Sequence, residues 1–293
     1  MKRIALLSLI ALFIVSACDD DNDDVQPMNN ELTLNIVGLS NLGSDWTYEG
    51  WIMVDDAPQT TGTFNVDDNG NLSKTSFELD ENDLDRATAF ILTIEPYPDN
   101  DPSPSPVHVL AGDFSGETAS LNIDHNAALG TGFNDAEGQY ILATPTTTET
   151  DDELSGIWFL SLVTGSPEAG LELPDLPDGW IYEGWVVIDG MPLSTGRFEE
   201  MDTADMSAPY SGNDASGPSF PGEDFIMNAP AGLSFPTNLS GAKAVISVEP
   251  DPDTGPEPFA IKPLAADIPM SAMDHETYLM SHTNNFPTGT AEK

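Results

Sequence analysis

The chain of 293 residues is strongly acidic, with 50 Asp and Glu against 8 Lys and Arg and a formal net charge of −42 at pH 7. Nucleic acids and anionic lipid headgroups are bound by clustered Lys and Arg, so this charge argues against a nucleic-acid partner. The sequence has a single cysteine and therefore no intramolecular disulfide, which leaves the packing of the core to hold the fold together.

Residues 1–17 have the pattern of a bacterial lipoprotein signal peptide. Lys2 and Arg3 precede an apolar run from Ile4 to Val15. This run is shorter than the roughly 20 residues that a membrane-spanning helix needs, so it indicates a cleaved export signal. Because V-S-A-C at 15–18 resembles a lipobox, we expect cleavage before Cys18 and anchoring to the membrane through lipid on Cys18. An ordinary secretory signal with an incidental cysteine is the alternative.

Residues 18–30 predict an acidic, disordered tether, because a run of Asp with Pro and Asn has no apolar surface to bury. An acidic cluster just after the lipidated cysteine resembles surface-export signals of some Gram-negative lineages. In other lineages an Asp directly after the cysteine favours the inner membrane. We therefore expect an extracytoplasmic lipoprotein of the outer membrane or cell surface, with the inner membrane as the alternative.

A tandem repeat begins at the phrases WTYEGW from Trp46 and WIYEGW from Trp180. Aligned without gaps, residues 46–64 and 180–198 share ten of nineteen residues. Further on, ILTIEPYPD from Ile91 matches VISVEPDPD from Val245, at an offset that has grown by twenty residues. The pattern predicts two domains, 31–150 and 151–293, the second with a surface-loop insertion at 201–225.

Each repeat is rich in short strand patterns. Alternation places Trp46, Tyr48, Ile52 and Val54 on one face of a strand, and both faces of the matching second strand are apolar. The phrases DDAP and DGMP after these strands are typical of tight turns. Further strands are predicted at 76–79, 89–95, 107–110, 139–144, 157–162, 244–249 and 259–264. We therefore expect an all-β fold of two tandem antiparallel β-sandwich domains of the immunoglobulin-like kind.

The order Y-E-G-W, then D-x-x-P-x-[ST]-T-G-x-F, then a strand that ends in E-P resembles the C-terminal, extracytoplasmic domain of anti-sigma-K factors. The resemblance covers about 70 residues of each repeat. In the first repeat it is carried by Tyr48, Glu49, Trp51, Pro58, Gly62, Phe64, Glu95 and Pro96. In the second it is carried by Tyr182, Glu183, Trp185, Pro192, Gly196, Phe198, Glu249 and Pro250.

The chain departs from that family before the repeats. Family members carry a cytoplasmic sigma-binding domain and a membrane helix there, whereas this chain has a lipoprotein signal. The resemblance therefore implies the extracytoplasmic module and an envelope partner such as a membrane anti-sigma factor. It does not imply direct binding of a sigma factor in the cytoplasm.

The repeated glutamates are the first candidates for chemistry. Glu49 and Glu183 are flanked by aromatic residues, where desolvation would raise their pKa values. We favour the interpretation of structural strand glutamates for both, and equally for Glu95 and Glu249, because a residue before proline is simply held extended.

Metal-binding patterns are weak. NVDDNGN at 65–71 has the alternating oxygen ligands of a calcium loop, but its twelfth position is Ser76 instead of Glu. Asn69-Gly70 is also a strong hairpin turn, which we favour. The pairs at 124–125 and 274–275, both Asp-His, are better explained as turn caps than as ligands. We expect no metal, no cofactor and no catalytic residue.

The sequence thus predicts an exported, lipid-anchored, non-enzymatic envelope protein for interaction or sensing, linked to regulation of sigma factor activity by the resemblance. The alternative is a cell-surface binding lipoprotein for a polymer or a divalent cation. An unrecognised hydrolase is the third and least favoured interpretation.

Overall fold

The structure, a computed structural model, describes residues 30–293. Nearly all of its regular structure is antiparallel β-strand, which confirms the predicted all-β, sandwich-type fold class. The predicted signal peptide, Cys18 and all but the last residue of the predicted tether lie outside the described residues. No helix within residues 30–293 is long and apolar enough to cross a membrane.

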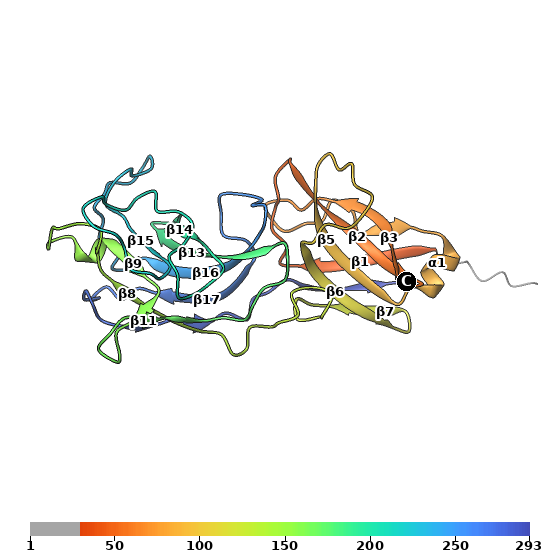
Figure 1. Cartoon of the computed structure of the whole chain (residues 1–293). Helices are drawn as coiled ribbons and strands as arrows, with labels where there is room; N and C mark the ends of the chain where they lie inside the picture. The colour runs from red at the N-terminus through yellow and green to blue at the C-terminus, as the bar shows by residue number, and fades with distance from the viewer. Residues whose placement is uncertain (1–29) are drawn as a thin grey trace, which may run out of the picture.

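One continuous sheet of eight strands, with a short helix α1 (Glu81–Arg86), forms what we call the first unit (Figure 1). The order of strands across this sheet is β3-β2-β5-β6-β7-β20-β1-β4. Their bounds are β1 Glu31–Val37, β2 Trp46–Val54, β3 Ala57–Phe64, β4 Ser76–Glu78, β5 Ala89–Pro96, β6 His108–Ser115, β7 Thr118–Leu121 and β20 Thr288–Glu292.

The second unit has a five-stranded sheet, β14-β13-β16-β17-β19, and a second layer in which β8 pairs with β12, β9 and β18, and β9 with β15. The small β10–β11 pair and a single 3₁₀ turn, η1 (Glu153–Ser155), complete it. The strand bounds are β8 Glu137–Leu142, β9 Gly156–Trp158, β10 Leu160–Ser161, β11 Glu168–Ala169, β12 Leu171–Glu172, β13 Trp180–Ile188, β14 Met191–Phe198, β15 Gly222–Asp224, β16 Lys243–Pro250, β17 Ile261–Asp267, β18 Tyr278–Leu279 and β19 Ser281–His282.

The local sequence explains the central hairpins. β13 is buried along almost its whole length, as its two apolar faces predict. β2, for which the pattern predicted only one apolar face, is buried to nearly the same extent. The turn after β2 uses Asp55 and Asp56, and the turn after β13 uses Asp189 and Gly190, all with positive φ. Two such residues make the turn that matches the twist of a hairpin, so the predicted turns are confirmed.

Corresponding strands occupy corresponding places, because the order β3-β2-β5-β6 in the first unit is repeated as β14-β13-β16-β17 in the second. Likewise β1 pairs with β4, and β9 pairs with β15. A register shift between Gly50 and Trp51 recurs between Gly184 and Trp185. The repeat in the sequence is therefore a repeat in the sheets.

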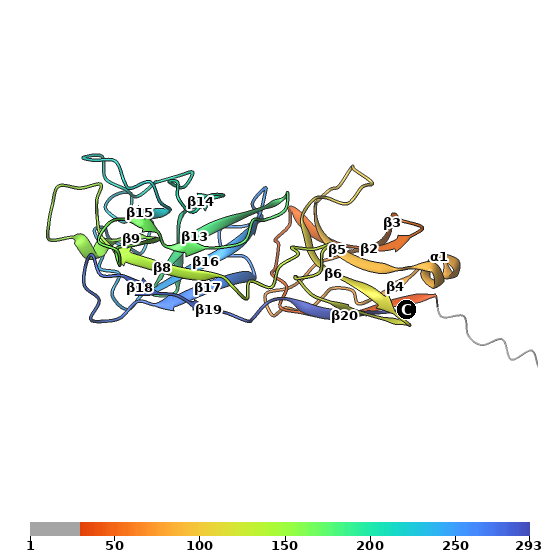
Figure 2. The same ribbon diagram turned by 60° about the horizontal axis from the view of Figure 1, so that its bottom comes forward.

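The two units exchange one strand each. On the side of β1 away from β4 lies β20, which joins the sheet of the first unit although it follows the whole second repeat in the sequence (Figure 2). On the side of β9 away from β15 lies β8, which joins the second unit although it is the last strand of the first repeat in the sequence. The predicted boundary at residues 150 and 151 is therefore wrong for β8 and β20. The boundary was predicted from a change in composition. The chain, however, passes into the second unit earlier, between β7 and β8, and returns to the first unit between β19 and β20.

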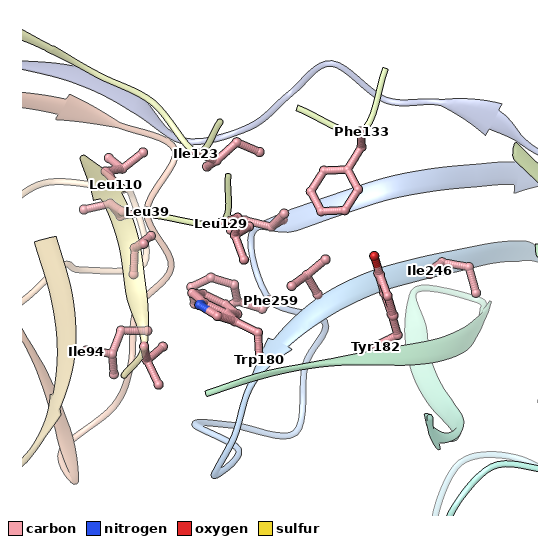
Figure 3. Packing of buried hydrophobic residues seen from close by; sticks show 14 of the residues in the cluster. Leu39, Ile94, Leu110, Ile123, Leu129, Phe133, Trp180, Tyr182, Ile246 and Phe259 are labelled. Carbon is pink, nitrogen blue, oxygen red and sulfur yellow. The ribbon is translucent and has the colours of Figure 1, made fainter. Parts of the chain in front are cut away.

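The exchange is accompanied by one apolar core that includes residues of both units. Trp180 packs on Phe259 with ring centroids 5.7 Å apart, and Leu39, Ile94 and Leu110 of the first unit belong to the same cluster (Figure 3). Phe133 lies between β7 and β8, and Phe286 lies between β19 and β20, where the chain crosses between the units. Their ring centroids are 5.9 Å apart. A second, smaller cluster of Ile141, Ala143, Trp158 and Leu160 lies within the second unit.

The extra residues of the second repeat are split between two places. The connection from β14 to β15 is twelve residues longer than the equivalent connection from β3 to β4. The connection from β15 to β16 is eight residues longer than that from β4 to β5. The prediction of one insertion at 201–225 is therefore wrong in placing all the extra residues in a single segment. It is also wrong in describing that whole segment as surface loop. Its last residues form β15, which is completely buried against β9.

Charging a buried position on each exchanged strand tests the exchange. We expect Ala291→Asp on β20 to cost roughly 3 kcal/mol or more, because it buries an unpaired charge, and to remove hydrogen-exchange protection from β1 and β7 in the first unit. Leu142→Asp on β8 should instead expose β9 in the second unit. Glu292→Gln, at an exposed neighbour, is the control. A greater loss of protection in the second unit than in the first after Ala291→Asp would contradict the exchange.

Candidate functional site

The repeated glutamates lie in two buried polar clusters, one in each unit. In the first cluster, Trp51 on β2 donates from Nε1 to Thr93 Oγ1 on β5 at 2.9 Å. Thr93 donates in turn to Glu95 Oε1, which also accepts from the backbone N–H of Ser105 at 2.9 Å. The indole, hydroxyl and carboxylate thus connect β2, β5 and the loop that follows β5.

The second cluster repeats this chain of hydrogen bonds. Trp185 Nε1 donates to Ser247 Oγ at 2.7 Å, and Ser247 donates to Glu249 Oε1. The backbone N–H of Phe259 donates to the same carboxylate oxygen at 2.8 Å. Burial raises the pKa of Glu95, and it raises the pKa of Glu249 to about 7. Each carboxyl therefore joins a strand to a loop instead of facing solvent.

The glutamates of the two YEGW phrases accept hydrogen bonds from hydroxyls at equivalent positions of the two units. Thr60 donates to Glu49 Oε1, and Ser194 donates to Glu183 Oε1. Both hydroxyls belong to the neighbouring edge strand, β3 or β14. These contacts support the structural interpretation of all four glutamates over a catalytic one.

The other residues of the repeated motif also serve the architecture. The Tyr48 ring stacks on Phe64 and its hydroxyl donates to the Ser40 carbonyl, while Tyr182 stacks on Phe198 and donates to the Pro174 carbonyl. Gly62 and Gly196 have φ values of 110° and 128°, which residues with a Cβ rarely adopt. The prolines lie near the start of the edge strands or at the end of an inner strand, namely Pro58, Pro192, Pro96 and Pro250.

The second unit adds charged residues that have no counterpart in the first cluster. Arg197 Nε lies 3.8 Å from Glu183 Oε2, and neither atom has a hydrogen bond within residues 30–293. The other guanidinium nitrogens contact the Pro250 carbonyl and Asp251. Asp205, from the connection between β14 and β15, accepts from the Gly222 N–H at 3.0 Å, and burial raises its pKa to about 7.

Glu223 and Asp224 on β15 are completely buried, and the sequence did not indicate them. Ser211 donates to Glu223 Oε1, whereas Glu223 Oε2 has no partner within residues 30–293. Asp224 accepts from Trp158 Nε1 at 2.8 Å and from the N–H and hydroxyl of Thr146. Their neighbours Phe220 and Phe225 are the only local sign of burial in a segment rich in Gly, Pro and Ser.

Burial without a cationic partner determines the protonation of Glu223. Desolvation raises its pKa to about 8, and the nearby Asp205 and Asp224 add to this effect. A fully buried carboxyl with only neutral donors keeps its proton at neutral pH. The connection between β14 and β15 is thus attached to the sheet by at least one neutral carboxyl group, that of Glu223.

The other predicted sites resolve into turns. Asp67 Oδ1 accepts the backbone N–H groups of Asn69 and Asn71 at 2.9 Å, so it closes the predicted hairpin turn. His125 likewise accepts from the Ala127 N–H at 3.2 Å, while its carbonyl accepts from Ala128 and Gly130. In the part of the chain that the structure describes, no three His, Cys, Asp or Glu residues are grouped to hold a metal ion.

Comparisons with protein-family models, with curated proteins and with solved structures gave no match.

Protonation of the buried carboxyls predicts a pH-dependent stability. The folded state holds a proton on Glu223 up to about pH 8, whereas a free Glu loses it near its ordinary pKa of 4.5. The resulting stability is complete below pH 4.5 and is lost as the pH rises to about 8. We expect the free energy of unfolding in urea to fall by at least about 1 kcal/mol across this range.

Glu223→Gln should reduce this pH dependence, because an amide does not titrate; Glu249 and Asp205, whose pKa values are also raised, keep the remainder. Glu276→Gln, at an exposed position, is the matched control and should leave the slope unchanged. A variant Glu223→Gln with the full slope of the wild type would contradict the assignment of the proton to Glu223.

Proposed function

We propose that this chain is an exported, lipid-anchored, non-enzymatic envelope protein that presents its second unit to a protein partner. The observation that carries the proposal is the place where the chain enters the fold. β1 starts at the end of the first unit that points away from the second unit (Figure 1). With a lipid on Cys18, twelve residues before Asn30, the second unit would be the part that projects away from the membrane.

The roles of the motif residues support an interaction function over catalysis. The carboxyl groups of Glu95 and Glu249 are held between a tryptophan-linked hydroxyl and a backbone N–H. Acid–base catalysis needs a carboxyl within reach of a substrate proton, and these groups face the loops that bury them. We therefore place function on the exposed loops of the second unit.

The link to sigma factor regulation depends on the resemblance to anti-sigma-K factors. The residues that carry this resemblance form the strands, turns and buried clusters of both units. A shared module of this kind would suit pairing with a membrane-bound relative in the same compartment. We propose such a membrane anti-sigma factor as the partner to look for first.

Site-specific photo-crosslinking of the full-length lipoprotein in its own cells tests the proposal. A photoreactive residue at Asp214, exposed in the second unit, should give a defined adduct with one envelope protein, identified by mass spectrometry. The same residue at Asp85, exposed on α1 in the first unit, is the matched control and should give little adduct. A Cys18→Ser form, which cannot be lipidated, should lose the Asp214 adduct.

The outcomes separate the parts of the proposal. An anti-sigma protein in the Asp214 adduct would support the regulatory link, and a different envelope protein would leave only the interaction function. Adducts from Asp85 alone, or an Asp214 adduct that persists unchanged in the Cys18→Ser form, would contradict the proposed display of the second unit.

A further inference from the structure

A groove of about 410 Å³ opens on the second unit, beside the start of β13. It is formed by the segment that leads into β13, by the end of β14 and by the first residue after β16. Five carboxylates line it, from Asp175, Asp178, Glu199, Glu200 and Asp251. Leu176, which is partly exposed, supplies apolar surface between them, and the almost fully buried rings of Tyr182 and Phe198 lie behind it. The groove therefore combines an acidic rim with an apolar wall.

Most of this negative charge is uncompensated. Asp251 is the exception, because its Oδ1 lies 3.3 Å from Nη1 of Arg197. The side chains of the other four accept no hydrogen bond and form no ion pair with any residue in the range 30–293, and all four residues are exposed. Like charges gathered around a low-dielectric wall reinforce one another and attract cations.

The first unit provides an internal comparison for this groove. The hydroxyl of Tyr48 donates to the carbonyl of Ser40, and that of Tyr182 donates to the carbonyl of Pro174. In each unit the acceptor lies eight residues before the tyrosine. The repeats can therefore be aligned here residue by residue. After β5 and β16, the N–H groups of Tyr97 and Asp251 likewise donate to equivalent carbonyls.

None of the five acidic positions is acidic in the first unit. The residues that correspond to Asp175, Asp178, Glu199, Glu200 and Asp251 are Asn41, Ser44, Asn65, Val66 and Tyr97. Because two equivalent hydrogen bonds hold the backbone here in both units, these bonds do not require carboxylates at the five positions. The acidic lining is a property of the second unit alone.

A donor without an acceptor lies beside this rim. Trp180 lines the groove, is 6% exposed, and has no hydrogen-bond partner for its indole Nε1 among the described residues. A buried polar group left unpaired destabilises the structure, so an acceptor supplied by a ligand would be favourable here. A bare metal ion offers no acceptor to an N–H group, whereas a peptide backbone offers carbonyl oxygens.

We propose that this groove binds a basic segment of a protein partner. Lys or Arg side chains of the segment pair with Asp175, Asp178, Glu199 and Glu200, and its backbone lies along the apolar wall beside Trp180. The inference rests on the proposed function, since it names the surface and the chemistry of the partner that the second unit meets. The charge of the groove sets orientation and association rate, as is usual for complementary charged interfaces.

Fluorescence anisotropy with the detergent-solubilised, full-length lipoprotein tests the groove. The probe is a labelled octapeptide of alternating Arg and Gly, and the negative control is its Glu-Gly analogue. The groove variant carries the residues of the first unit, Asp175→Asn, Asp178→Ser, Glu199→Asn and Glu200→Val. We expect it to bind the Arg probe at least about 10-fold more weakly in 0.15 M salt.

A matched variant separates this groove from the general charge of the protein. It removes four exposed carboxylates elsewhere, by Asp56→Asn, Asp85→Asn, Glu117→Gln and Glu276→Gln. We expect this variant to bind within about 2-fold of wild type. Equal weakening of the two variants, or no binding of the Arg probe by wild type, would overturn the proposal. Displacement of the probe by submillimolar calcium would also overturn it, in favour of a cation site.

Failure here and failure of the proposed function can be distinguished in cells. If the Asp214 adduct forms equally well in the groove variant, the interaction function stands and the groove is not its binding surface. If the adduct is lost in the groove variant but kept in the matched variant, both the function and the groove are supported.

Discussion

The reciprocal exchange of β8 and β20 is the constraint on which the rest of the structure depends. Each strand completes a sheet that the other repeat began, so neither repeat has a full set of strands of its own. The core is correspondingly shared, with Phe133 and Phe286 in contact where the two crossing segments meet. Without disulfides, this arrangement joins the two units by main-chain pairing and apolar packing.

The buried carboxyl groups form a second layer of constraint on the outer side of these sheets. In both units a glutamate before proline ties the end of a strand to the loop that follows it, through a tryptophan and a hydroxyl. The second unit extends this scheme with Asp205, Glu223 and Asp224, which attach its longer connections to β15. Burial raises the pKa values of these carboxyl groups, which suits a chain whose few Lys and Arg residues offer little cationic charge to pair with them. The uncompensated carboxylates that remain lie outside, around the groove beside β13.

Local sequence patterns predicted the elements whose form depends on local rules. Period-two alternation and the Asp-containing turns were sufficient for β2, β3, β13 and β14. The predicted set lacks β20, because Thr-Gly-Thr-Ala-Glu has no clear strand pattern and pairs only in the slot between β1 and β7. The four repeated glutamates were predicted to be structural, and their hydrogen bonds support this. Glu223 and Asp224 could not be predicted, since their burial depends on β9 and on Thr146, about 80 residues away.

Disulfide trapping across β1 and β20 tests the exchange most directly. Asn35 and Thr290 are register partners on these two strands, and partners in antiparallel strands lie at distances that a disulfide can bridge. The only native cysteine is Cys18, so Asn35→Cys with Thr290→Cys in a Cys18→Ser background gives a clean readout. The account predicts rapid formation of an intramolecular disulfide, seen as a monomer of altered mobility that reduction reverses. No disulfide, or disulfides only between separate chains, would contradict the exchange and with it the core that the two units share.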